Sequence, residues 1–142
     1  MRICKLFLTI LVIVLLGWIP FSSVRAVPPL PSTFWGIVTI NGENVPAGIE
    51  VSAWINGIQY ANTETIIHDG QSKYIIDVPG DDPSTPGVIE GGEPGDVITF
   101  KVGNLVAPET ATWQSGNYNQ HDLTLMGEVQ EKYQIFLPMV LK

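Results

Sequence analysis

Cysteine is almost absent from this chain of 142 residues, and its single example, Cys4, lies near the N-terminus. A disulfide framework within the chain is therefore excluded, and so are the cysteine-rich sites that hold structural zinc. Basic residues are also scarce, with seven lysines and arginines against 14 aspartates and glutamates and a formal net charge of −7. Such a surface repels phosphate backbones and anionic headgroups, so we expect no nucleic acid partner and no anionic membrane surface.

Sequence motifs of known catalytic sites are missing too. Histidine occurs only as His68 and His121, and no Gly-x-Ser-x-Gly elbow, His-Glu-x-x-His pair or Cys-His arrangement accompanies them. His68 precedes Asp69-Gly70, which predicts a hairpin tip, whereas His121 shares the alternation of Leu123 and Leu125. Two distant histidines are also too few for zinc. We therefore expect no enzymatic activity and no catalytic residue.

Long hydrophobic runs are confined to the N-terminus. Two basic residues precede an apolar run over residues 6–19, and Val24-Arg25-Ala26 then fits the small-residue pattern of a cleavage site. The run is shorter than the roughly 20 residues that span a bilayer, which favours cleavage over the alternative of a membrane anchor. Residues 1–26 are thus predicted to be a signal peptide. The secreted chain would begin at Val27, keep a formal charge of −10 from four lysines and 14 acids, and retain no membrane span.

Short alternations of apolar and polar residues dominate the rest of the chain and predict half-buried strands. These predicted strands cover residues 33–40, 49–55, 58–67, 73–78, 97–102, 104–107, 111–113 and 120–126. Asn41-Gly42, Asn56-Gly57 and Asp69-Gly70 lie between runs and favour tight hairpin turns. We predict an all-β fold, an antiparallel β-sandwich of seven or eight strands over residues 33–127, with a closed barrel as the alternative.

Two further segments depart from this pattern. Residues 27–32 form a proline-rich leader, and residues 79–95 form a long acidic loop. Loops longer than about 12–15 residues in compact domains are often functional, and oxygen-rich loops suit hard cations such as calcium. The candidate calcium ligands are Asp81, Asp82, Glu90, Glu93 and Asp96. An ordinary solvated loop is the alternative, because no EF-hand spacing is present, and we expect no other cofactor.

Aromatic side chains suggest a second kind of site. Trp35 and Trp54 alternate with the more apolar faces of their strands, and Trp113 and Tyr118 flank an amide-rich segment. If these rings reach the surface, Trp35, Trp54, Trp113 and Tyr118 are candidates for carbohydrate binding. The alternative is that they fill the core, where large aromatic residues are mostly found.

The predicted first strands resemble a known family. Phe34-Trp35-Gly36-Ile37-Val38-Thr39-Ile40-Asn41-Gly42, followed by Val45-Pro46-Ala47-Gly48-Ile49-Glu50-Val51-Ser52-Ala53, is similar to the opening of carboxypeptidase-regulatory-like, or transthyretin-like, modules of secreted bacterial proteins. The resemblance implies an Ig-like sandwich of seven strands and an accessory, non-catalytic role. It implies no catalytic residue.

The C-terminal tail, residues 128–142, carries a second resemblance. Residues 133–142, Tyr-Gln-Ile-Phe-Leu-Pro-Met-Val-Leu-Lys, resemble the tails of exported proteins from certain filamentous bacteria. The tail is too short to span a bilayer. Two interpretations stay open, a docked terminal strand and a sorting or surface-attachment tag.

These observations predict a secreted, non-catalytic structural or adhesive β-sandwich module of the cell surface or extracellular matrix. Its partner would be an extracellular protein or a polysaccharide. A carbohydrate-binding module that uses exposed tryptophans is the alternative function.

Overall fold

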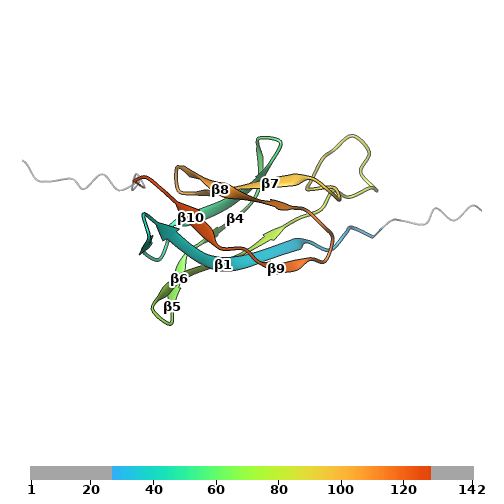
Figure 1. Ribbon diagram of the computed structural model, residues 1–142. Coiled ribbons are helices and arrows are strands. Elements are labelled where there is room, and N and C mark those ends of the chain that lie inside the picture. The colour runs from blue at the N-terminus through green and yellow to red at the C-terminus, as the bar shows by residue number, and fades with distance from the viewer. Residues whose placement is uncertain (1–26, 129–142) are drawn as a thin grey trace, which may run out of the picture.

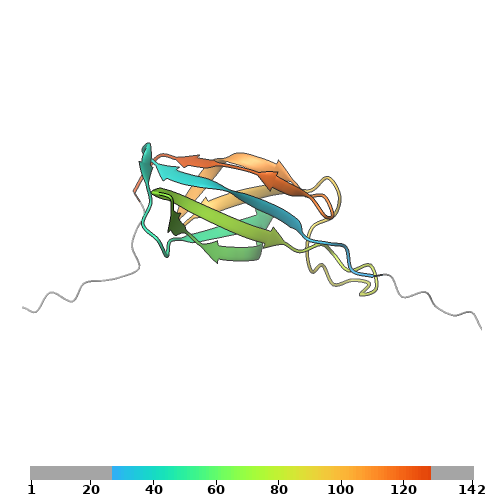
Figure 2. The same cartoon turned by 90° about the horizontal axis from the view of Figure 1, so that it is seen from below.

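The computed structural model describes residues 27–128, which form ten strands and no helix. The strands are β1 (Ser32–Ile40), β2 (Glu43–Asn44), β3 (Glu50–Ile55), β4 (Ile58–Glu64), β5 (Ile66–His68), β6 (Gln71–Val78), β7 (Val97–Val102), β8 (Leu105–Thr112), β9 (Tyr118–Gln120) and β10 (Leu123–Leu125). They are arranged in two sheets that pack face to face (Figures 1 and 2). The prediction of an all-β sandwich is confirmed at this level.

The two sheets differ in their pairing. The β3 sheet has the order β4-β3-β7-β8 and is antiparallel throughout. The β1 sheet has the order β10-β1-β6-β5, and β2 and β9 also pair with β1. Within it, β9 and β10 run parallel to β1, whereas the other pairings are antiparallel. Most pairings are therefore antiparallel, as predicted for the sandwich, and the parallel pairings of β9 and β10 with β1 are the exceptions.

The strand count also exceeds the seven or eight that we predicted. Two predicted strands are each divided and the short β2 was not predicted, whereas the predicted strands 104–107 and 111–113 are joined in β8. The stretch 58–67 was expected as one strand but leaves the β3 sheet as β4 and joins the β1 sheet as β5. Thr65 stands at this corner and is buried, and its Oγ1 donates to the Pro46 carbonyl at 2.7 Å and accepts from the Ile49 N–H at 3.0 Å. The Thr65 backbone is bonded as well, since its N–H donates to the Ile49 carbonyl at 2.9 Å and its carbonyl accepts from the Gly48 N–H at 2.8 Å. Backbone and hydroxyl together therefore satisfy the polar groups of the corner where the strand changes sheet.

The second division separates β9 from β10 at His121 and Asp122, opposite Gly36 of β1. The His121 N–H donates to the Trp35 carbonyl at 2.7 Å, and Asp122 Oδ1 accepts from the Ile37 N–H at 2.9 Å. A Cβ at Gly36 would lie 2.5 Å from the His121 carbonyl oxygen. Glycine is therefore required here because the crossing backbone approaches β1 too closely for a side chain.

The three predicted hairpin turns are confirmed. Asn41-Gly42, Asn56-Gly57 and Asp69-Gly70 all have positive φ at both residues, from 51° at Asn56 to 82° at Gly42. Two consecutive residues with positive φ are typical of type I′ turns, whose twist matches that of the flanking strands. The turns therefore fix the register of the strand pairs that they join.

The core lies between the sheets and follows the predicted alternation. Along β1, even-numbered residues such as Phe34 and Val38 are buried, and odd-numbered residues face outward. The Phe34 ring meets the Phe100 ring of the opposite sheet edge to face, with the centroids 5.5 Å apart. Aromatic pairs prefer this geometry, and it ties the two sheets together at their centre.

Several predictions fall on residues outside the described range. The predicted signal peptide, residues 1–26, and the tail beyond residue 128 are among them. Between residues 27 and 128, the chain contains no helix of the length and hydrophobicity needed to cross a membrane.

The proline-rich leader lies against the domain, since the Leu30 and Pro31 carbonyls accept from the Gly116 N–H at 3.3 and 3.2 Å.

Candidate functional site

The outer side of the β1 sheet carries a contiguous group of apolar side chains. We call this group the Trp35 face and define it as Trp35, Ile37, Ile66, Ile75 and Tyr118. The strand register places them together, because Trp35 is opposite Ile75, while Ile37 and Ile66 are both opposite Lys73. Ile66, Ile75 and Tyr118 expose 58, 52 and 64 % of their surface, respectively. Exposed apolar residues that are grouped on one face, unlike scattered ones, mark candidate interaction sites.

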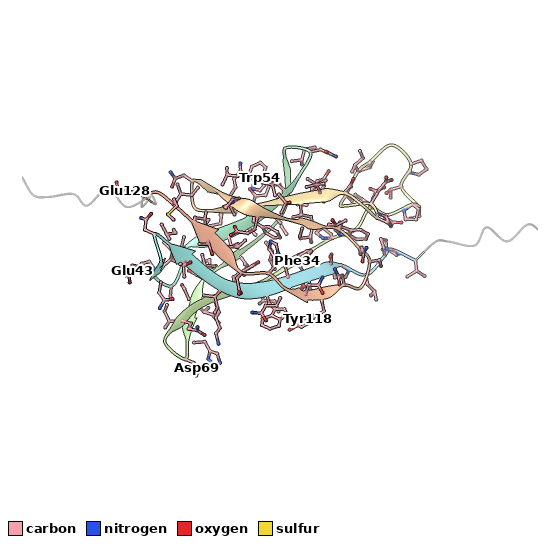
Figure 3. The ribbon with its side chains drawn as sticks, in the orientation of Figure 1. Phe34, Glu43, Trp54, Asp69, Tyr118 and Glu128 are labelled. Atoms are coloured by element: carbon pink, nitrogen blue, oxygen red, sulfur yellow. The ribbon has the colours of Figure 1, made fainter. Side chains whose placement is uncertain are left out.

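Trp35 and Tyr118 form an aromatic pair on this face. Their ring centroids are 6.1 Å apart and the ring planes are inclined by 34°. The pair arises from the parallel pairing of β9 with β1, in which Tyr118 is opposite Thr33, the strand neighbour two positions before Trp35. Figure 3 shows Tyr118 on the outer side of the β1 sheet, away from Phe34 in the core. The two rings therefore form one continuous aromatic surface.

Polar groups surround the aromatic pair. Thr33 Oγ1 donates to Asp77 Oδ1 at 2.6 Å across β1 and β6. Gln120 is opposite Trp35 on β9, and its amide lies 3.4 Å from both carboxylate oxygens of Asp122. An apolar centre with a polar rim is the usual composition of a recognition surface.

The other two predicted aromatic residues lie elsewhere. Trp54 projects from the outer side of the β3 sheet, on the opposite side of the molecule from Tyr118 (Figure 3). Lys101 Nζ lies 3.5 Å from the centroid of the Trp54 ring, and the indole N–H donates to Ser52 Oγ at 2.8 Å. A cation–π contact and a local hydrogen bond thus already occupy this indole.

Trp113 is part of the core. Its side chain is fully buried, and its Nε1–H donates to the Val78 carbonyl at 3.0 Å. Gly80 and Gly92 lie so close to the indole that a Cβ on either would come within 2.6 Å of it. Trp113 therefore packs in the core beside the long loop and is not available to a ligand. Of the four aromatic candidates, only Trp35 and Tyr118 are brought together.

A second candidate site is a cleft at the open edge of the sandwich, between β8 and β9. It has a volume of about 300 Å³ and is lined by Phe34, Ala111, Thr112, Gln114, Asn117, Asn119, Gln120 and His121. The carboxamides give the cleft a neutral, polar lining. The His121 ring covers its floor, with its centroid 5.0 Å from that of Phe100 and 6.0 Å from that of Phe34.

Burial shifts the pKa values of two side chains at this edge, His121 and Tyr74. Burial lowers the pKa of His121, while Glu109 and Asp122 act in the opposite direction. Burial also raises the pKa of the Tyr74 hydroxyl, which donates to the His121 carbonyl at 2.6 Å. His121 Nε2 and Glu109 Oε2 are both inaccessible and have no hydrogen-bond partner among the described residues. An imidazole nitrogen that solvent does not reach is poorly placed to exchange a proton with a substrate.

His68, the other histidine, lies at the predicted hairpin tip. It is exposed, and its Nε2 lies 3.3 Å from Asp69 Oδ2. Its exposure and its contact with the neighbouring Asp69 are those of an ordinary turn residue. The two histidines thus occupy a turn and a sheet edge, and the structure does not bring them together.

The carboxylates of the long loop stabilise its backbone. Asp81 Oδ1 accepts from the Glu90 N–H, Asp82 Oδ1 from the Ser84 N–H and Asp96 Oδ2 from the Glu93 N–H, all at 2.8–2.9 Å. Within residues 27–128, no three His, Cys, Asp or Glu side chains are grouped closely enough to hold a metal ion. The geometry therefore gives the predicted calcium site no support.

Comparison with protein families, with curated proteins and with solved structures gave no match. The candidate sites consequently rest on the geometry of this chain alone.

Sequence reasoning missed the polar groups that join β9 to β10. Asp122 and Glu109 lie far apart in the sequence, yet both act on His121, and Glu109 Oε1 accepts from the Thr124 N–H at 3.2 Å. A signal was present in Gly36, an isolated glycine inside a strand pattern, which indicates that another backbone approaches closely.

Proposed function

We propose that this chain is an exported, non-catalytic module that attaches to an extracellular surface through the Trp35 face. The observation that carries the proposal is the exposure of the apolar side chains on the outer side of the β1 sheet. Export rests on the N-terminal pattern of the sequence. An accessory role agrees with the resemblance to carboxypeptidase-regulatory-like modules.

The composition of the Trp35 face supports attachment. Contiguous exposed apolar surface that is rimmed by polar groups marks interaction sites on proteins. The rim consists of Thr33, Lys73, Asp77 and Gln120, which the strand register places beside the apolar residues. Trp35, Ile37 and Ile75 lie on β1 and β6, which are paired on both sides, so binding to this part of the face costs little ordering of the backbone.

The histidine environments support a non-catalytic role. His68 is an exposed turn residue, and solvent does not reach His121 Nε2. Among the described residues, neither histidine has the arrangement of an oriented base beside a nucleophile. Attachment requires no such group, because it depends on surface complementarity alone.

A retention assay tests the proposal. The full chain, expressed with its own N-terminal segment, is applied to surfaces coated with extracellular matrix proteins or with polysaccharides, and the fraction that survives washing is measured. We expect at least one surface to retain the wild type and the double variant Ile66→Ser/Ile75→Ser to lose that retention.

The matched control is Val88→Ser/Ile89→Ser. These residues are as exposed as Ile66 and Ile75, at 55 and 70 %, but lie in the long loop. The control should be retained like the wild type, and unfolding curves should be similar for all three proteins. The proposal is refuted if no surface retains the wild type or if both double variants behave alike.

A further inference from the structure

The Trp35 face combines two features that a ligand would have to match. It holds a pair of adjacent aromatic rings, and polar side chains stand directly beside them. A wholly apolar partner would use only the rings, and a wholly polar partner would use only the rim. A ligand that matches both must present C–H surface and hydroxyl groups at close spacing.

Part of each ring is open to such a ligand. Tyr118 is 64 % exposed, whereas Trp35 is half-buried and its indole Nε1 is inaccessible to solvent. Within residues 27–128, no cationic group lies over either ring of the pair. The faces of aromatic rings carry negative partial charge and attract polarised C–H groups. Trp54 on the opposite sheet differs, because Lys101 lies over its ring at 3.5 Å. Both tryptophans are half-buried, but Lys101 covers the ring of Trp54 and no cation covers the ring of Trp35 among the described residues.

Hydrogen-bonding groups are positioned in advance beside the rings. The 2.6 Å bond from Thr33 Oγ1 fixes the Asp77 carboxylate across the strands. Asp77 Oδ2 has no hydrogen bond to any other described residue, so it can accept from a ligand hydroxyl. Gln120, opposite Trp35 on the other side, adds an amide whose Nε2 lies 3.4 Å from the Asp122 carboxylate and whose carbonyl oxygen can accept from a ligand hydroxyl.

The charge of the chain limits the chemistry of the ligand. The formal net charge is −7, and the single cation in the rim of the Trp35 face, Lys73, is paired with Asp69 at 3.8 Å, while Asp77 adds a carboxylate. An anionic polymer would be repelled by this field and would lose solvation of its charges on binding. A neutral polymer incurs neither cost.

We infer that the Trp35 face binds a neutral polysaccharide, with sugar rings stacked on Trp35 and Tyr118 and hydroxyl groups bonded to Asp77 and Gln120. The inference rests on the proposed function, since it names the chemistry of the surface to which the module attaches. It requires no metal ion.

Affinity electrophoresis tests the inference with the full chain in native gels. The neutral polymers in the gels are hydroxyethyl cellulose, galactomannan and dextran, and carboxymethyl cellulose serves as the anionic counterpart of the first. We expect at least one neutral polymer to retard the wild type and carboxymethyl cellulose not to retard it. Tyr118→Ala should weaken the retarding interaction about tenfold, the loss of one aromatic contact. Trp35→Phe should weaken it less, because a smaller ring remains.

Two matched variants locate the contact. Trp54→Ala removes an indole from the opposite sheet, and Asn119→Ala changes the β9 residue that faces the cleft instead of the Trp35 face. Both should bind like the wild type. The inference is overturned if no neutral polymer retards the protein, if carboxymethyl cellulose retards it equally, or if either control loses binding as Tyr118→Ala does.

The result is separable from that of the retention assay. If a protein-coated surface retains the wild type through Ile66 and Ile75 while no polysaccharide binds, attachment stands and the glycan inference fails. If no surface of either kind retains the chain, both fail.

Discussion

Gly36→Ala tests the account of the crossing between β9 and β10. The added Cβ would lie 2.5 Å from the His121 carbonyl oxygen and 2.6 Å from Asp122 Oδ1, so the crossing backbone must move away from β1. That movement strains the bonds at 2.7 Å from the His121 N–H and at 2.9 Å to Asp122 Oδ1. Overpacking costs about 1–3 kcal/mol, and two lost hydrogen bonds cost about 1 kcal/mol each. Alanine returns about 0.5–1 kcal/mol by restricting the unfolded chain.

The net expectation is a loss of about 2–4 kcal/mol in the free energy of unfolding, or roughly 10–25 °C in Tm for a domain of this size. Urea unfolding monitored by tryptophan fluorescence gives the value. Gly42→Ala is the control, because nothing lies within 4 Å of its Cβ position and only its φ of +82° opposes alanine. That strain costs about 1–2 kcal/mol. If Gly36→Ala costs no more than Gly42→Ala, the close approach does not control stability and the reasoning is wrong.

Three further measurements test other parts of the structure. Thr65→Val removes a buried hydroxyl with two backbone partners and should cost about 1–3 kcal/mol in urea unfolding, whereas Thr63→Val on the adjoining strand should cost much less. Burial lowers the pKa of His121 in the folded chain. Its neutral form therefore contributes to the free energy of unfolding, fully above about pH 6.5, and this contribution is lost as the pH falls through the lowered pKa. The free energy of unfolding should fall less steeply from pH 7 to 5 in His121→Gln than in the wild type, and an unchanged slope would contradict this. Calcium should raise Tm no more than magnesium at equal ionic strength, and a calcium-specific rise that Asp81→Asn/Asp82→Asn abolishes would instead establish the loop as a metal site.

Local alternation predicted several strands well. The alternation at 97–102 matches β7 at both ends, and the Asn-Gly turns have the expected positive φ. The stretches 104–107 and 111–113 were expected as two strands, yet β8 is continuous through Pro108. A proline is tolerated there because β8 is the edge of its sheet, and edge position is a property of tertiary structure.

The candidate site depended more heavily on contacts between distant residues. Trp35 and Tyr118 meet only through the parallel pairing of β1 with β9, which no turn residue specifies. Trp113 ends the predicted strand 111–113 and Tyr118 precedes the predicted strand 120–126, so the pattern does not assign either ring to the core or to the surface. Packing against Gly80 and Gly92 places Trp113 in the core. Residue type therefore identified the aromatic candidates, but it could not separate the surface pair from the buried indole.

The parallel pairing of β1 with β10 also determines how the domain would respond to tension. The described chain enters at the end of the sandwich that holds the long loop and leaves at the opposite end, beside β2 (Figures 1 and 2). A force that pulls these two ends apart draws β1 and β10 in opposite directions along their shared ladder, where Val38 to Ile40 pair with Leu123 to Leu125. The backbone bonds of that ladder then resist in shear and must yield together, whereas a ladder pulled from one end opens a bond at a time. Anchored at one end and drawn at the other, this sandwich would therefore unfold by sliding its terminal strands past each other.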